Sequence, residues 1–97
     1  MKALMISFDQ AHQQNVLDVL DRSNARGFTM IPTTNGRGTK TGEPHFGSHA
    51  WPSMCSTIFT MVEDEQVEPL LKRLHAVDKE YERLGLRAFV WNIEQQV

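Results

Sequence analysis

The feature that most constrains the fold is a long segment, Thr33 to Ser53, that separates two strand-like runs. The runs are Phe28 to Pro32 and Met54 to Val62, and the residues between them have the pattern of neither a tight hairpin turn nor a helix. Connections of this length inside a compact domain are usually functional or disordered. The segment contains Phe46 and Trp51, which a disordered linker would lack. The sequence therefore predicts that the functional chemistry lies in this segment.

Composition narrows the class of protein. The chain of 97 residues is 40% hydrophobic and 23% charged, as expected for a single globular domain over residues 1–97. A net charge of −2, with lysines and arginines spread along the chain, argues against nucleic-acid binding. No apolar run approaches membrane-spanning length, and the one cysteine, Cys55, fits a reducing compartment. We expect a cytoplasmic protein that does not insert into a membrane.

Hydrophobic periodicity predicts the order strand, helix, strand, long segment, strand, helix, strand. Pro32 predicts an edge position or a strand end for its strand, whereas apolar residues on both faces predict a central position for the strand after the segment. The six elements are expected at Lys2 to Phe8, Gln10 to Ser23, Phe28 to Pro32, Met54 to Val62, Glu65 to Leu84 and Leu86 to Ile93. This order predicts an α+β, ferredoxin-like βαββαβ fold with both helices on one face of an antiparallel sheet.

Capping residues predict where the helices begin and end. Asp9 is expected to cap the first helix, and Gly27 to stop it. Glu63 or Asp64 is expected to cap the second helix, and Gly85 to end it.

Several stretches resemble the nitrogen regulatory P-II signalling proteins and their P-II-like relatives. They are GFTMIP leading into NGRGTKTG, then STIFTMVEDEQVEPLLKRL, and finally LRAFVWNIEQ, so the resemblance covers nearly the whole chain. The most specific part is VEDEQVEPLL. The resemblance implies a homotrimer in which residues 33–53 correspond to the family's T-loop and reach ligands and partner proteins. It also implies that adenine nucleotides, ATP or ADP, bind in the clefts between subunits.

The resemblance assigns nucleotide contacts to individual positions. Gly36, Arg37, Gly38 and Lys40 correspond to the phosphate-contacting turn at the base of the T-loop, and Arg87 to a nucleotide-contacting lysine before the last strand. From the residues alone, the glycines either form an anion-binding concavity or simply let the chain turn. The chain departs from the family in three places: the long segment has no tyrosine, KEYERLG replaces a second glycine-rich loop, and the last residues, EQQV, carry no basic side chain.

A second candidate site is a metal site in the same segment. His45 and His49 lie four residues apart, and neutral imidazoles bind zinc, nickel, cobalt and copper. A third ligand would come from Glu43, Cys55 or a neighbouring subunit. The surrounding GEPHFGSHAWP resembles a divergent P-II-like branch found beside heavy-metal efflux systems, which implies a transition-metal effector or a membrane transporter as partner. The alternative is that both histidines are simply solvated.

The expected function is regulatory: the long segment senses a small effector and docks on a partner. An enzyme is not expected, because the sequence shows no clear nucleophile and base, carboxylate pair or open metal site. Two alternatives remain, a small ferredoxin-like enzyme with its site at the subunit interface and an interaction module without effector. His12 and His75 are expected on helix surfaces, and Trp51 is expected to anchor the returning limb of the segment.

Overall fold

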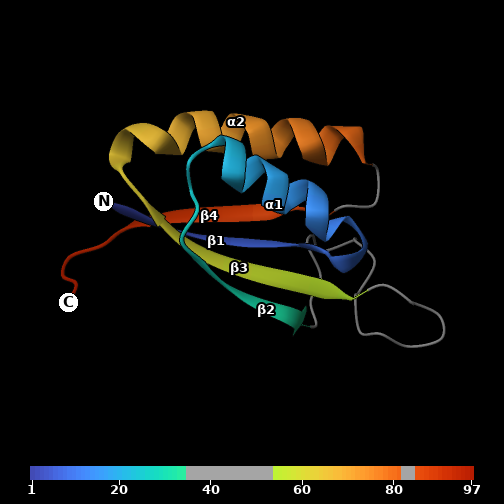
Figure 1. Ribbon diagram of the computed structural model, residues 1–97, viewed down its shortest axis with the longest axis horizontal. Coiled ribbons are helices and arrows are strands. Elements are labelled where there is room, and N and C mark those ends of the chain that lie inside the picture. Colours follow the sequence, from blue (N-terminus) through green and yellow to red (C-terminus); the bar gives the residue numbers. More distant parts are fainter. Residues whose placement is uncertain (35–53, 82–84) are drawn as a thin grey trace.

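The computed structural model of the chain describes residues 1–34, 54–81 and 85–97. The elements follow the predicted order, with one short 3-10 helix added before the first α-helix (Figure 1). They are β1 (Lys2–Asp9), η1 (Gln10–His12), α1 (Gln13–Arg22), β2 (Phe28–Thr34), β3 (Cys55–Val62), α2 (Asp64–Glu80) and β4 (Arg87–Asn92).

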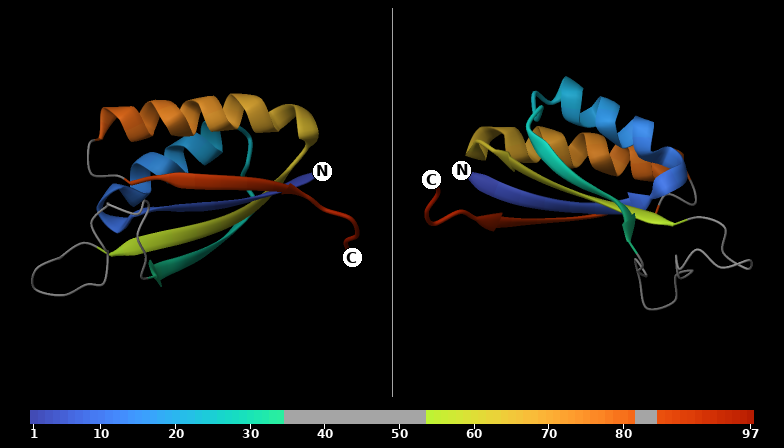
Figure 2. Two further views of the ribbon diagram at one scale, coloured as in Figure 1. Left: turned by 180° about the vertical axis from the view of Figure 1, so that it is seen from behind. Right: turned by 60° about the horizontal axis from the view of Figure 1, so that its bottom comes forward.

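The four strands form one antiparallel sheet in the order β2-β3-β1-β4. Both helices cover the same face of this sheet, and the described part of the chain places no helix on the other face (Figure 2). The expected ferredoxin-like α+β fold is therefore confirmed, as are the edge position of β2 and the central position of β3. Among the described residues, no helix is long and apolar enough to cross a membrane.

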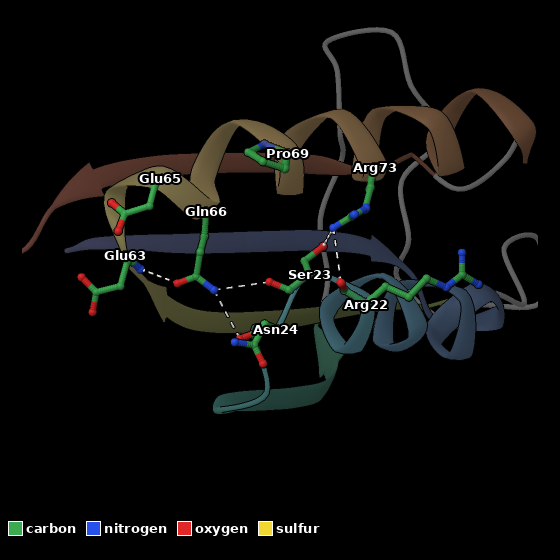
Figure 3. Close-up of a pocket in the computed structure, with 8 residues that line it drawn as sticks. All are labelled: Arg22, Ser23, Asn24, Glu63, Glu65, Gln66, Pro69 and Arg73. Atoms are coloured by element: carbon green, nitrogen blue, oxygen red, sulfur yellow. Dashed lines mark hydrogen bonds between the residues drawn. The ribbon is translucent and has the colours of Figure 1, made fainter.

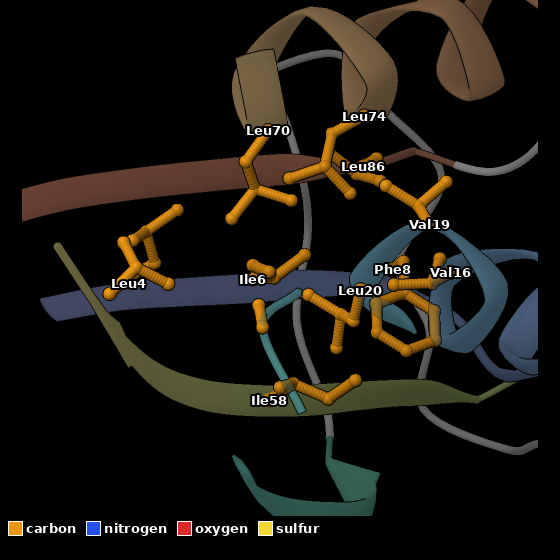
Figure 4. Close-up of a cluster of buried hydrophobic side chains, with 12 residues drawn as sticks. Leu4, Ile6, Phe8, Val16, Val19, Leu20, Ile58, Leu70, Leu74 and Leu86 are labelled. Atoms are coloured by element: carbon orange, nitrogen blue, oxygen red, sulfur yellow. The ribbon is translucent and has the colours of Figure 1, made fainter. Parts of the chain in front are cut away.

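The core lies between the sheet and the helices. Alternation along β1 places Leu4, Ile6 and Phe8 beneath the helices, and all three are fully buried. The helices close the core from the other side with Val16, Val19, Leu20, Leu70 and Leu74 (Figure 4). Burial of one such side chain contributes about 1.5–3 kcal/mol, so this layer holds both helices on the sheet.

The first helix begins as predicted. Asp9 Oδ1 accepts a hydrogen bond from Ala11 N at 2.8 Å and so caps the chain as it leaves β1. The next three residues form the 3-10 helix η1, and the α-helix proper starts at Gln13. The chain therefore becomes helical at Gln10, as predicted, but the first turn is a 3-10 helix and not an α-helix.

The predicted stop of this helix at Gly27 is wrong. The helix ends at Arg22, and Asn24 takes the left-handed conformation with φ of 60°. Ala25 N then donates to Leu20 O at 2.8 Å, the long-range bond of a Schellman motif. Asparagine adopts this backbone conformation more readily than most residues, so the turn does not need the glycine three positions later.

β2 runs two residues beyond the predicted end at Pro32. Its register with β3 shifts between Ile31 and Thr34, which marks a bulge. The buried Ser56 Oγ of β3 donates to Pro32 O at 2.9 Å. A side-chain hydroxyl thus supplies a hydrogen bond where the proline interrupts the regular ladder, and the strand continues.

The second helix is capped by Glu63, one of the two predicted caps. Glu63 N donates to Gln66 Oε1 at 2.8 Å, and Gln66 N donates back to Glu63 O at 3.0 Å. Asp64 is not the cap: it is the first helical residue, and its carboxylate lies 2.9 Å from the amino group of Met1. The exchange of bonds between residues three apart anchors the first turn of α2.

This helix ends earlier than predicted. Its last residue is Glu80, and Tyr81 already has extended φ and ψ of −113° and 104°. Gly85 has a positive φ of 59°, but it follows the helix at a distance and does not end it, which corrects the prediction. Asp78 Oδ1 accepts a hydrogen bond from Leu86 N at 3.1 Å and so directs the chain into β4.

Candidate functional site

The residues that precede and follow the long segment lie at the same end of the sheet. We call this end of the sheet the loop end. β2 ends there at Thr34, and β3 begins there at Cys55, directly opposite Thr34 in the register. Asp9, the last residue of β1, lies opposite Cys55 on its other side. β4 begins at the same end with Arg87, which pairs with Ser7 (Figure 1). Residues far apart in the sequence therefore converge where the chain enters and leaves the candidate segment.

Arg87 is the one predicted nucleotide-contacting residue that belongs to the described part of the chain. It is half-buried, and its Nη1 donates to Leu86 O at 2.8 Å. Gly36, Arg37, Gly38, Lys40, His45 and His49 lie outside the described residues, as do Glu43 and Trp51. What the structure establishes is that Arg87 and the two ends of the segment occupy the same end of one sheet.

Cys55 is buried at the loop end, and its thiol does not resemble a reactive cysteine. Burial raises the pKa of Cys55, and the nearby charge of Asp9 raises it further, whereas a hydrogen bond with Ser7 lowers it. A raised pKa keeps the thiol protonated, but both metal binding and nucleophilic attack need the thiolate. Among the residues the structure describes, no three His, Cys, Asp or Glu side chains are grouped so that they could hold a metal ion.

The two helical histidines differ from each other. His75 is exposed on α2, as expected. His12 is half-buried, and its ring stacks on Tyr81, with centroids 4.7 Å apart and an interplanar angle of 30°. No local pattern in the sequence indicates this pair, because the two rings come from elements far apart in the chain whose contact depends on the tertiary packing.

A cleft of about 530 Å³ lies between the end of α1 and the start of α2 (Figure 3). Gln66 Nε2 donates to both Ser23 O and Asn24 O, each at 3.3 Å. Arg73 Nη1 donates to Ser23 Oγ at 3.0 Å and to Arg22 O at 3.4 Å. The last carbonyls of a helix lack partners within it, and a cation there also complements the helix dipole. The polar groups of this cleft therefore fix α1 on α2.

The helix-free face of the sheet carries four large apolar side chains that are exposed. By register it carries Ile31, Met61, Phe89 and Trp91, whose exposed fractions are 43%, 51%, 53% and 46%. Next to Met61 and Trp91, the tail after β4 lines one side of an open hollow of about 470 Å³. Large contiguous apolar patches on a protein surface usually mark interaction sites. This face is therefore a candidate contact surface.

One antiparallel sheet with two helices on one face, and a long segment leaving the end where β4 begins, defines an α+β protein of the ferredoxin-like class. Comparison with known proteins agrees. The family model described as nitrogen regulatory protein P-II matches residues 1–97, and the chain belongs to this family of signalling proteins. No match was found among curated proteins.

Solved structures support the same assignment. The chain is similar to CPII from Thiomonas intermedia K12 bound to ADP and bicarbonate, with 27% identity and a TM-score of 0.76 over 95% of this chain and 84% of that one. A second structure of that protein, bound to ADP, AMP and bicarbonate, has 22% identity and a TM-score of 0.72 over 97% and 88%. A putative PII-like signaling protein from Thermus thermophilus has 22% identity and a TM-score of 0.66 over 95% and 85%. The last two matches show the shared fold.

Proposed function

We propose that the chain is a single-domain P-II-like regulator that binds an adenine nucleotide at the loop end of the sheet and so controls docking of residues 33–53 on a partner. The observation that carries this proposal is the position of Arg87, a half-buried cation at the end of the sheet where that segment begins and ends. The relative bound to ADP and bicarbonate makes a nucleotide the first effector to test.

Assembly explains how Arg87 and the segment come to share a site. β2 and β4 are at opposite edges of the sheet, so Arg87 and Thr34 of one chain are separated by two strands. A closed ring with a head-to-tail interface brings one edge of a subunit beside the opposite edge of the next. In a homotrimer of this kind, Arg87 of one subunit lies beside the segment of its neighbour, and the apolar helix-free face turns inward. The nucleotide then occupies the cleft between subunits, with Gly36, Arg37, Gly38 and Lys40 contacting its phosphates.

The proposed regulator acts by binding and not by catalysis. Burial and the nearby charge of Asp9 raise the pKa of Cys55, which argues against the one cysteine as a nucleophile. Ligand contacts instead offset the conformational entropy of ordering a glycine-rich segment, so the effector selects the arrangement that docks on a partner. A membrane transporter is the partner class that the resemblance to proteins found beside efflux systems favours.

Calorimetric titration of ADP into the purified protein tests this proposal. We expect saturable binding that weakens about ten- to a hundredfold in Arg87→Gln, because hydrogen bonds to charged groups contribute about 1.5–3 kcal/mol. Arg26→Gln is the matched control, since Arg26 lies before β2, away from the loop end, and pairs with exposed Asp21. Absence of binding, or equal affinity in the two variants, would refute the nucleotide site.

The second candidate effector is a transition-metal ion at His45 and His49. Their side chains belong to the same segment, and imidazole suits zinc and nickel. Titration of zinc and nickel into the protein and into a His45→Ala, His49→Ala double variant separates this case from the first. Saturable metal binding that the double variant loses, together with no heat from ADP, would replace the nucleotide by a metal.

A further inference from the structure

The 3-10 helix η1 contacts the residue that directly precedes β3, where the long segment returns to the sheet. Gln10 N donates to Met54 O at 2.6 Å, which ties the first residue of η1 to the returning limb directly before β3. Gln13, the first residue of α1, accepts a hydrogen bond at Oε1 from Ser56 Oγ of β3 at 3.3 Å, and the same hydroxyl donates to Pro32 O of β2. η1 is therefore bonded directly to the returning end of the segment, whereas Pro32, before the segment, is linked to the start of α1 through Ser56 of β3.

The same element contacts the connection between α2 and β4. His12, its last residue, stacks on Tyr81 at 4.7 Å. Tyr81 is the C-cap of α2, directly after its last residue, and the chain reaches Arg87 of β4 six positions later. A 3-10 stretch is a tighter helix than the α-helix that follows it and has poorer hydrogen-bond geometry.

We propose that η1 is a positioning element that couples the returning limb at Met54 to the end of α2 at Tyr81. A displacement of Tyr81 moves the imidazole of His12, and through η1 it weakens the bond from Gln10 N to Met54 O. His12 and Tyr81 are positioning residues, because they act through η1. That the coupled ends belong to an effector site rests on the proposed function, but the coupling itself is a property of the protein without ligand.

Amide hydrogen exchange followed by NMR in the ligand-free protein tests the coupling. The amide of Gln10 reports on its bond to Met54, which is a separate contact from the stack between His12 and Tyr81. Tyr81→Ala removes the stack, and Tyr81→Phe retains an aromatic ring and is the matched control. His12→Ala removes the stack from the other side and covers the case in which Tyr81→Ala folds poorly.

We expect Gln10 exchange to accelerate about fivefold in Tyr81→Ala and in His12→Ala, the factor that loss of one aromatic pair corresponds to. Amides of the β1–β3 ladder, such as that of Ile6, should keep their rates, as should Gln10 in Tyr81→Phe. Unchanged Gln10 exchange in both alanine variants overturns the coupling. Equal acceleration of Gln10 and Ile6 also overturns it, because that is the signature of general destabilisation.

A second measurement asks whether the coupling reaches the effector. If ADP binds, we expect its affinity to fall about fivefold in Tyr81→Ala and to stay unchanged in Tyr81→Phe, with the same stoichiometry. Equal affinities in both variants contradict a positioning role in the site. If the unmodified protein does not bind ADP, the proposed nucleotide site fails, and the exchange experiment still decides the coupling.

Discussion

Replacing Phe89 by serine should weaken self-association through the helix-free face. The ring of Phe89 is 53% exposed in the single chain. An aromatic side chain buries about 150–250 Å² when fully covered, so about 100 Å² remains for an interface to cover. At about 25 cal/mol per Å² this area corresponds to roughly 2.5 kcal/mol, most of which the serine loses. A loss of about 2 kcal/mol lowers the association constant of each contact between subunits about 30-fold.

Sedimentation velocity over a wide concentration range measures this effect. We expect the unmodified protein to have an apparent mass about three times the 11.1 kDa of one chain. The Phe89→Ser variant should dissociate into single chains as it is diluted. Phe28→Ser is the control, because Phe28 is 44% exposed but its register with Thr60 places it on the helix-covered side. An undiminished mass of Phe89→Ser at every concentration, or equal dissociation of Phe28→Ser, would refute the assignment of the interface to this face. Circular dichroism should show that both variants remain folded.

Three further predictions concern single groups. Ser56→Ala should lower the free energy of unfolding, measured in urea, by about 1 kcal/mol, because Pro32 O loses its hydrogen-bond partner. Gln14→Ala on the exposed face of α1 is the control and should have little effect. Equal effects of the two substitutions would contradict the role of the Ser56 hydroxyl. The hydrogen bond from the amino group of Met1 lowers the pKa of Asp64, so its stabilisation is present above the ordinary carboxyl pKa and is lost as pH falls through the lowered pKa. In Asp64→Asn the thermal unfolding midpoint should therefore depend less on pH in that acid range. An unchanged pH profile would count against the ion pair between Met1 and Asp64. Burial raises the pKa of Cys55, so iodoacetamide should modify the native thiol more slowly than the urea-unfolded thiol at mildly alkaline pH, and equal rates would show that the thiol is accessible.

The sequence predicted the fold because each strand carries a local pattern that burial enforces. Leu4, Ile6 and Phe8 alternate along β1, and all three are fully buried beneath the helices. Asp9 and Glu63 were predictable as caps because a cap depends on a few neighbouring residues. Gln66 was open to the same logic, since a glutamine three positions after the cap is a known signal.

Helix ends that depend on distant contacts were not predictable in this way. The first helix ends at a left-handed asparagine, and Gln66 and Arg73 of α2 hold the carbonyls around that turn. The second helix ends at Glu80, and its C-cap residue Tyr81 packs against His12 and the core. These contacts form only when α1 and α2 lie side by side, and no spacing within either helix encodes them.

The sequence order of the strands made the position of Arg87 relative to residues 33–53 predictable, but the site itself stays a prediction. Arg87 lies at the end of the sheet where residues 33–53 begin and end, because β4 starts where β2 ends. The predicted phosphate and metal contacts of Gly36 to His49 concern residues outside the described ranges and stay predictions. No local sequence pattern indicates that η1 contacts both Met54 and Tyr81, because these contacts join three stretches that are far apart in the sequence.

The bulge in β2 also limits how chains of this protein can join. Regular pairing of β2 with β3 covers only Phe28 to Ile31 before the register shifts at Pro32. A short edge that twists away at a bulge is a poor template for a strand from another molecule. Contacts between copies are thereby directed to side chains, and endless growth of one sheet into fibrils is disfavoured.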